Sequence, residues 1–277
     1  MQSIGWTLAV AIVTLALAAG GFKLSQIARA QVQQQERFRV SLASVELSPL
    51  PVWIHGDLLG EVKFLSGLPD TVNTLEPNLA ERLRSAFALH PWVCEVLEVR
   101  ITQPATIRVQ LAYREPVAVV RTARSLEPVD REGVLLPAAG FPNPEVYLTV
   151  SGVRSTPTGP AGTRWDDSAV GAAARVAEAV TPHHRTLGLT TLDVSRYRPN
   201  AAAASQIYLL TEQGTRVKWG RPDPDYPGEV STEDKLDRLR QYVADHGSLD
   251  SPAGPYDIDV THWQEVSIRP RQGTGPK

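Results

Sequence analysis

The sequence predicts an α+β protein with three parts: an N-terminal transmembrane helix, a two-layer domain, and a mixed β-rich domain whose helices pack on an antiparallel sheet. Three observations support this prediction. The chain begins with a long uncharged run, continues with helical segments beside two alternating strands, and ends in short strand-like segments separated by turns. In the two-layer domain we expect the order strand, helix, helix, strand, strand.

Composition limits the classes of function that fit the chain. Of its 277 residues, 42% are hydrophobic and 21% are charged, so we expect most of the chain to fold around a hydrophobic core. The formal net charge is −2 and the pI is about 6.3, which gives no basic footprint for nucleic acid. The single cysteine, Cys94, excludes an intrachain disulfide and a multi-cysteine zinc site.

The uncharged run covers residues 4–22 and reads IGWTLAVAIVTLALAAGGF. A helix of this length, with a rise of about 1.5 Å per residue, nearly matches a bilayer core of about 30 Å. We therefore predict a tail over residues 1–3, a transmembrane helix over 4–24 and a stalk over 25–44. A cleaved signal peptide is the alternative, because ALAAGG, or ARA at residues 28–30, fits a signal peptidase site.

The charges around this run favour one orientation. Lys23, Arg29, Arg37 and Arg39 follow it, whereas no Lys or Arg precedes it. The positive-inside rule, taken alone, would keep the bulk of the chain in the cytoplasm. This orientation disagrees with the one that the motifs described below imply.

The two-layer domain is predicted over residues 45–115. We expect a strand at Val52–Ile54, a turn, and a short helix around Leu58–Leu65. Proline is favoured at a first helical position, so Pro77 is expected to open a second helix, which ends at His90-Pro91. The apolar stripe of this helix comprises Leu79, Leu83, Ala86 and Phe87.

Two runs with period-2 alternation complete this domain. Apolar residues alternate with polar ones over residues 97–101 and again over 107–113. The break between them contains Gln103-Pro104, so the pattern predicts an antiparallel hairpin with one buried face.

The β-rich domain is predicted over residues 116–270, followed by a disordered tail over 271–277. Its short strand-like segments alternate with two helices, one over residues 166–180 and one after Ser231. Ser231 and Asp234 form a capping-box pattern, and Gly247 is a suitable helix stop. Gly133 is expected at a hairpin turn, and Trp92 is expected in the core.

Several motifs in this order resemble one family, the bacterial cell-division protein FtsQ/DivIB. The first half carries Pro91-Trp92-Val93, a strand, Gln103-Pro104, a second strand and then Arg114-Glu115-Pro116-Val117-Ala118, which resembles a POTRA domain. VDREGVLL over residues 129–136 and VKWGRP followed by DKLDRLRQYV resemble the β domain of that family. YDIDVTHWQEVSIRP occupies the place of its last two strands. The resemblance covers roughly residues 4–270.

The resemblance implies a non-catalytic scaffold of the division machinery that needs no cofactor, nucleic acid or small-molecule substrate. It implies a single-pass protein of the plasma membrane, with the bulk outside the cytoplasm at the division site. Division proteins of the FtsB/FtsL type would pair with the terminal strand and the preceding helix. The residues carried over are Glu265, Val266, Ser267, Ile268, Arg269, Lys235, Arg238, Arg240 and Gln241.

Simpler interpretations exist for each of these residues. Val266 and Ile268 also fit the core side of an edge strand, and the helix charges also fit a solvated face. Arg114-Glu115 is expected to be a surface pair.

Two other classes of function are alternatives. A POTRA-type chaperone or secretion adaptor would need tandem POTRA modules or a membrane barrel. A metal-dependent envelope hydrolase would have to use His183-His184 with Asp166 and Asp167, or Asp223 and Asp225, although adjacent helical residues do not face each other. The sequence contains no G-x-S-x-G, H-E-x-x-H or Walker pattern.

Overall fold

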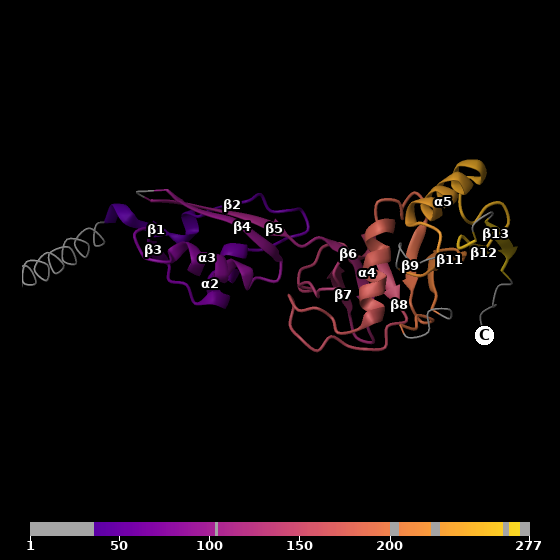
Figure 1. The fold of residues 1–277 in the computed structure, drawn as a ribbon, viewed down its shortest axis with the longest axis horizontal. Helices are drawn as coiled ribbons and strands as arrows, with labels where there is room; N and C mark the ends of the chain where they lie inside the picture. Colours follow the sequence, from indigo (N-terminus) through magenta and orange to yellow (C-terminus); the bar gives the residue numbers. More distant parts are fainter. Residues whose placement is uncertain (1–35, 103–104, 200–204, 223–227, 263–265, 272–277) are drawn as a thin grey trace, which may run out of the picture. The chain divides into compact units, whose positions relative to one another are not determined.

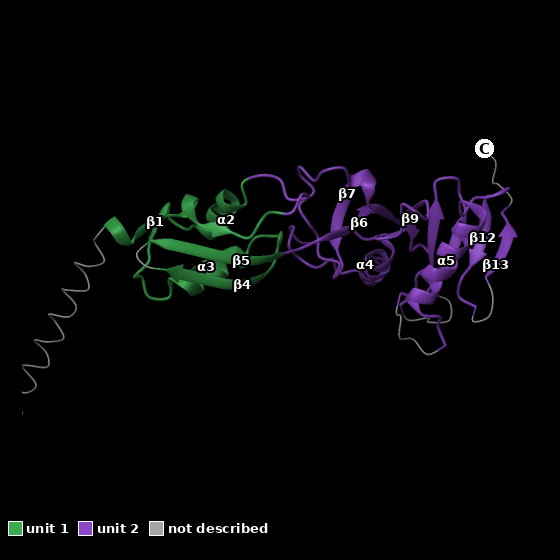
Figure 2. Ribbon diagram, turned by 90° about the horizontal axis from the view of Figure 1, so that it is seen from above, with its two compact units in different colours: residues 1–50, 57–112 green, residues 51–56, 113–277 purple. Residues whose placement is uncertain are grey.

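A computed structural model of the chain describes residues 36–102, 105–199, 205–222, 228–262 and 266–271 (Figure 1). The chain divides into two compact units (Figure 2). Unit 1 comprises residues 1–50 and 57–112, and unit 2 comprises residues 51–56 and 113–277. The assignment of these units to a POTRA domain and an FtsQ-type β domain stays a prediction.

The fold class needs a correction at the N-terminus. No helix within the described ranges is long and apolar enough to cross a membrane. The predicted transmembrane helix over residues 4–24 lies outside these ranges, and the described residues form an α+β fold.

Unit 1 contains two helices and two small sheets. Strand β1 pairs antiparallel with β3, and β5 lies between β2 and β4 in a three-stranded sheet. The elements in chain order are η1 (Glu36–Phe38), β1 (Arg39–Ser41), η2 (Leu42–Ser44), β2 (Glu46–Leu47), α2 (Leu58–Ser66), β3 (Thr71–Asn73), α3 (Leu79–Ala88), β4 (Val93–Thr102) and β5 (Thr106–Tyr113).

The apolar stripe of α3 is confirmed as the buried face of that helix. Leu79, Leu83, Ala86 and Phe87 are all buried, and Leu83 and Phe87 are fully so. The helix begins later than Pro77 predicted, because Asn78 takes a left-handed conformation as the N-cap residue. Trp92 is buried as expected.

The structure corrects the sequence prediction in two places that precede α2. Residues 39–41 form a strand instead of continuing a stalk, because Val40 is buried where β1 pairs with β3. The expected strand at Val52–Ile54 is a turn in which the Trp53 indole N–H donates to the Arg114 carbonyl at 3.0 Å. The short apolar run could not reveal this hydrogen bond, because its two partners are 61 residues apart in the sequence.

Unit 2 is built on one eight-stranded sheet in the order β13-β12-β11-β10-β9-β8-β6-β7. Its elements are β6 (Pro116–Arg121), β7 (Leu126–Asp130), η3 (Pro144–Val146), β8 (Leu148–Ser151), α4 (Ser168–Val180), β9 (Leu189–Asp193), β10 (Ile207–Thr211), β11 (Arg216–Gly220), α5 (Thr232–His246), β12 (Tyr256–Asp259) and β13 (Ser267–Pro270).

The predicted antiparallel sheet is wrong, because the sheet of unit 2 is mixed. Strand β8 pairs in parallel with both β6 and β9, and β11 pairs in parallel with β12. The physical reason lies in the connections. Helix α4 connects β8 to β9, and α5 connects β11 to β12, and a crossover of this kind returns the chain in the same direction.

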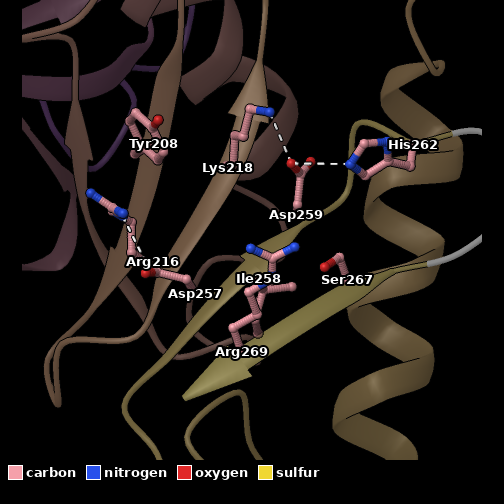
Figure 3. A pocket seen from close by; sticks show the side chains of 9 residues that line it. All are labelled: Tyr208, Arg216, Lys218, Asp257, Ile258, Asp259, His262, Ser267 and Arg269. Atoms are coloured by element: carbon pink, nitrogen blue, oxygen red, sulfur yellow. Dashed lines mark hydrogen bonds and ion pairs between the residues drawn. The ribbon is translucent and has the colours of Figure 1, made fainter. Parts of the chain in front are cut away.

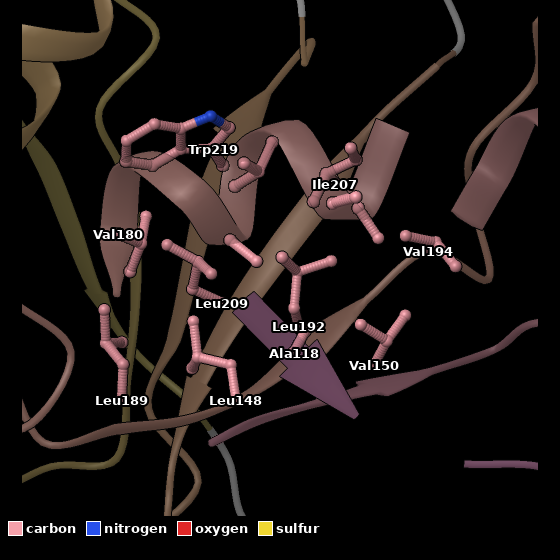
Figure 4. Close-up of a cluster of buried hydrophobic side chains, with 14 of the residues drawn as sticks. Ala118, Leu148, Val150, Val180, Leu189, Leu192, Val194, Ile207, Leu209 and Trp219 are labelled. Atoms are coloured by element: carbon pink, nitrogen blue, oxygen red, sulfur yellow. The ribbon is translucent and has the colours of Figure 1, made fainter. Parts of the chain in front are cut away.

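The core of unit 2 lies between the sheet and its helices. Leu148, Leu192 and Leu209 are completely buried and project from neighbouring strands into one apolar cluster (Figure 4). The alanine-rich α4 contributes Ala173 and Ala177, which are also completely buried, to the same cluster. Small side chains on this helix allow its backbone to lie close to the sheet.

The start of β6 lies beside the end of β7, and this end of the strand pair is stabilised by charge as well as by the turn that follows β7. Gly133 has a φ of 74°, as expected for its turn. The Arg114 guanidinium contacts Asp130 at 2.6 Å and Glu132 at 3.0 Å, and its side chain is only 16% exposed, so it does not form the surface pair that the sequence suggested. The Asp130 carboxylate also accepts from the Val134 backbone N–H at 2.8 Å, so one buried side chain connects the strand to the turn.

Replacing Leu83 with alanine should lower the free energy of unfolding by about 2–5 kcal/mol, because a fully buried leucine leaves a cavity. Leu89→Ala, just after the same helix, is the matched control, since Leu89 is 60% exposed and its loss should cost about 0.5 kcal/mol or less. Urea unfolding of both variants measures the difference. Equal destabilisation by the two substitutions would contradict the orientation of α3.

Candidate functional site

The candidate site lies at the end of the sheet formed by β11, β12 and β13, next to α5. The capping pattern predicted for this helix is confirmed. The Ser231 hydroxyl accepts from the Asp234 backbone N–H at 3.1 Å, and Gly247 ends the helix with a φ of 90°. Both helix ends are therefore determined by local sequence.

Helix α5 presents one polar face away from the core. Leu236 and Leu239 are buried, whereas Arg240 and Gln241 are exposed. Within the helix, Arg240 forms an ion pair with Asp237, and Gln241 donates to Asp245 at 2.9 Å. The outer face borders a hollow of ≈ 560 Å³, lined by Asp237, Arg238, Arg240, Gln241 and Ala244.

Lys235 is not part of this outer face, which corrects its place among the predicted surface residues. Its side chain is 2% exposed, and its ammonium donates to the Glu229 carboxylate at 2.7 Å. The Trp219 ring lies below the ammonium, 5.3 Å away at its centroid. Burial lowers the pKa of Lys235 below its ordinary value of 10.5, and the hydrogen bond to Glu229 acts against that shift.

The same carboxylate connects this pair to the end of β11. Glu229 also accepts from the Arg221 backbone N–H at 3.3 Å. A Cβ atom at Gly220 would collide with this carboxylate, and Gly220 has a φ of 87°. Glycine is therefore required at this position for two independent reasons.

Strand β13 is the last strand of the sheet. It pairs antiparallel with β12, with Ile258 opposite Ile268 and Asp259 opposite Ser267. Ile268 is 38% exposed, and Arg269 is exposed as well. Val266 is half-buried and packs against the core, and Glu265 lies outside the described residues.

Arg238 connects α5 to the segment between β12 and β13. Its guanidinium donates to the Val260 carbonyl at 3.1 Å and also to the His262 carbonyl. Because this segment leads into β13, the helix and the terminal strand are coupled through one side chain. The predicted helix residue Arg238 therefore positions the loop as well as lying near the surface.

The strands β10 to β13 also form a polar site that the sequence did not reveal (Figure 3). Arg216 pairs with Asp257 at 2.8 Å, and Lys218 pairs with Asp259 at 2.8 Å. The Arg216 guanidinium lies 4.8 Å from the centroid of the Tyr208 ring. The hollow between these side chains has a volume of ≈ 240 Å³ and also borders Ile258, His262, Ser267 and Arg269.

Asp259 is the most strongly hydrogen-bonded carboxylate of this polar site. Burial raises its pKa, but the hydrogen bonds from Lys218 and Thr261 outweigh this effect and hold the pKa below its ordinary value of 3.8. His262 approaches the same carboxylate at 3.5 Å. Arg216 and Lys218 are thus each neutralised by an acidic side chain on the neighbouring strand. Such pairs help to hold β11 and β12 in register, and their polar atoms can also bind polar groups.

The described residues considered for metal chemistry do not line this polar site. Both ring nitrogens of His184 face backbone carbonyl oxygens, that of Thr181 at 2.6 Å and that of Val146 at 3.1 Å. Asp167 caps α4 through the Ala169 backbone N–H, and Asp223 and Asp225 lie outside the described residues. Over the described ranges, no group of three or more His, Cys, Asp and Glu side chains is arranged to hold a metal ion.

The sequence did not predict these charged pairs, because the basic and the acidic partners lie in two strands that are far apart in the chain. RVKW at residues 216–219 and YDID at 256–259 each alternate, with basic residues in the first and acidic residues in the second. Their complementarity appears only when β11 and β12 are known to pair, with Arg216 opposite Asp257 and Lys218 opposite Asp259. Sequence alternation indicates which face a residue occupies but not which strand lies beside it.

Comparison with known proteins gives limited information. The chain matches no protein-family model and no curated protein sequence. Among solved structures it is similar to the major extracytoplasmic domain of the trans isomer of the bacterial cell division protein DivIB from Geobacillus stearothermophilus. The match has 14% identity and a TM-score of 0.29, and it covers 48% of this chain and 91% of that chain. Values this low do not place the chain in the family of that protein.

Replacing Glu229 with glutamine should destabilise unit 2 by about 3–5 kcal/mol, because it leaves a buried ammonium without its counter-charge. Asp237→Asn is the matched control on α5, since it breaks the exposed Arg240 pair and should cost less than about 1 kcal/mol. Chemical unfolding measures both. Equal decreases in the free energy of unfolding of the two variants would contradict a larger contribution of the buried Lys235–Glu229 pair to stability.

Acid should weaken unit 2 through Asp259. Because the pKa of this carboxyl is lower in the folded state, its contribution is present above about 3.8 and is lost as the pH falls through the folded value. Thermal unfolding from about pH 5 to about pH 2 should therefore show a shallower loss of stability in Asp259→Asn than in the wild type. Lys218→Met should move the loss to higher pH. Superimposable pH profiles for all three proteins would refute this assignment.

Proposed function

We propose that the chain is a non-catalytic docking protein of the bacterial division machinery, and that unit 2 receives a partner strand along the outer edge of β13. The observation that carries the proposal is the position of β13 at the end of the sheet, with Ile268 38% exposed. A sheet edge of this kind accepts an extended segment through backbone hydrogen bonds. The ordered sequence motifs supply the connection to division.

The hydrogen bonds of β13 indicate which backbone groups a partner can use. The Arg271 N–H donates to the Pro255 carbonyl at 2.8 Å, and Arg269 lies opposite Asp257. Because alternate residues of an antiparallel pair face the same neighbour, Ile268 and Pro270 direct their backbone groups outward. Proline has no N–H, so the outer edge of β13 offers the Ile268 N–H and the carbonyls of Ile268 and Pro270.

The partner belongs to the FtsB/FtsL type in this proposal, and it would contact α5 as well as β13. Arg240 and Gln241 are exposed on α5, while Arg238 holds the loop that leads into the strand. A segment that pairs with β13 and continues as a helix would therefore meet polar side chains on α5. The location outside the cytoplasm, at the division site, belongs to the same proposal.

Replacing Ile268 with proline should abolish co-purification of a co-expressed FtsB/FtsL-type partner, because it removes the outward N–H and spares the bonds to β12. Ile268→Ala is the matched control: it shortens the same side chain, retains the N–H, and should weaken binding only partly. Circular dichroism establishes that both variants fold. Wild-type recovery of the partner by folded Ile268→Pro would remove the edge assignment.

Fluorescent fusions of the same proteins test the division role itself. The wild type should gather at midcell, and its depletion should impair septation. Uniform envelope staining together with normal septation on depletion would contradict the division role, whatever the binding result.

A further inference from the structure

Strand β4 is exceptional among the sheet edges in the described ranges. It has ten residues and contains no proline, and it is the last strand of the sheet β2-β5-β4. The other edges are short or interrupted: β2 has two residues, β1 and β3 have three each, and β7 and β13 contain Pro128 and Pro270. Short strands and proline are the usual means by which proteins prevent edge pairing.

Part of β4 is open to contact with another strand. Leu97, within the strand, is 53% exposed and so offers apolar contact area. Arg84 donates to the Val96 carbonyl at 2.6 Å, so that carbonyl is already engaged. The segment after it, residues 97–102, remains for pairing with another strand.

The sequence of this segment is complementary to itself. Alternation places Leu97, Val99 and Ile101 on one face of the strand and Glu98 and Arg100 on the other. Within one chain Glu98 and Arg100 form an ion pair at 2.8 Å, with both side chains partly exposed. If two copies pair antiparallel with Val99 opposite Val99, each Glu98 lies opposite Arg100 of the second copy, and each Leu97 lies opposite Ile101.

We propose that two copies of this chain associate through the edges of their β4 strands, in antiparallel pairing centred on Val99. The pairing satisfies backbone groups at the free edge, covers Leu97, and extends each Glu98–Arg100 pair into a four-charge network. A contact of about six residues a side is small beside the roughly 20–30 residues of a standard interface, so the dimer is weak and forms where the chain is concentrated. This site lies in unit 1 and does not depend on the docking edge at β13.

Charge exchange provides a test that misfolding cannot imitate. Glu98→Arg alone and Arg100→Glu alone should each weaken dimerisation about tenfold, because like charges then lie opposite each other twice. The double variant Glu98→Arg/Arg100→Glu should dimerise like the wild type, and a mixture of the two single variants should form a heterodimer. Sedimentation of the purified full chain over a concentration series measures all four cases.

Cross-linking tests the register. In a Cys94→Ser background, Val99→Cys should form a disulfide-linked dimer under mild oxidation, since residues directly opposite each other are about 4.5–5.5 Å apart at Cα. Gln110→Cys is the matched control, because Gln110 is exposed on the inner strand β5 and should not cross-link. Equal cross-linking at both positions, a monomeric wild type at every concentration, or no recovery in the charge-exchanged double variant would each overturn the proposal.

Discussion

The parallel pairing of β11 with β12 is the constraint on which the C-terminal part of unit 2 depends. Helix α5 connects these strands and returns the chain to the end of the sheet where β11 began, so that β12 can run parallel to β11. The pairing brings Arg216 beside Asp257 and Lys218 beside Asp259 on the polar side. It also places β13 at the end of the sheet, on the edge where we propose that a partner strand pairs.

The buried contact between Lys235 and Glu229 explains how the crossover is held in place. Glu229 lies in the segment between β11 and α5, and Lys235 lies in the first part of the helix. Gly220 leaves the space that the carboxylate occupies. Because a buried ammonium is costly without its partner, the pair favours one arrangement of strand, loop and helix over others. Arg238, three residues further along the helix, acts similarly on the loop before β13.

The two units treat their sheet edges differently, and the difference has a physical consequence. In unit 2, Pro128 and Pro270 limit what the outer strands can bind. Pairing at β13 is thereby restricted to a few backbone groups, which favours a partner with additional contacts on α5. In unit 1, β4 has no such restriction and carries an exposed Leu97. A long edge without proline can pair with another strand along its length. In the proposed dimer, Glu98 and Arg100 of β4 face the opposite charges of a second copy.

The sequence alone determined the features that depend on neighbouring residues: the apolar stripe of α3, the capping of α5 by Ser231 and Gly247, and the turn at Gly133. These are short-range effects, in which a side chain and its backbone partner lie within a few positions. Tertiary structure decided that the sheet is mixed, that Lys235 is buried and that Arg114 contacts Asp130. Each of these joins residues whose proximity depends on which strands and segments meet, and periodicity carries no information about that choice.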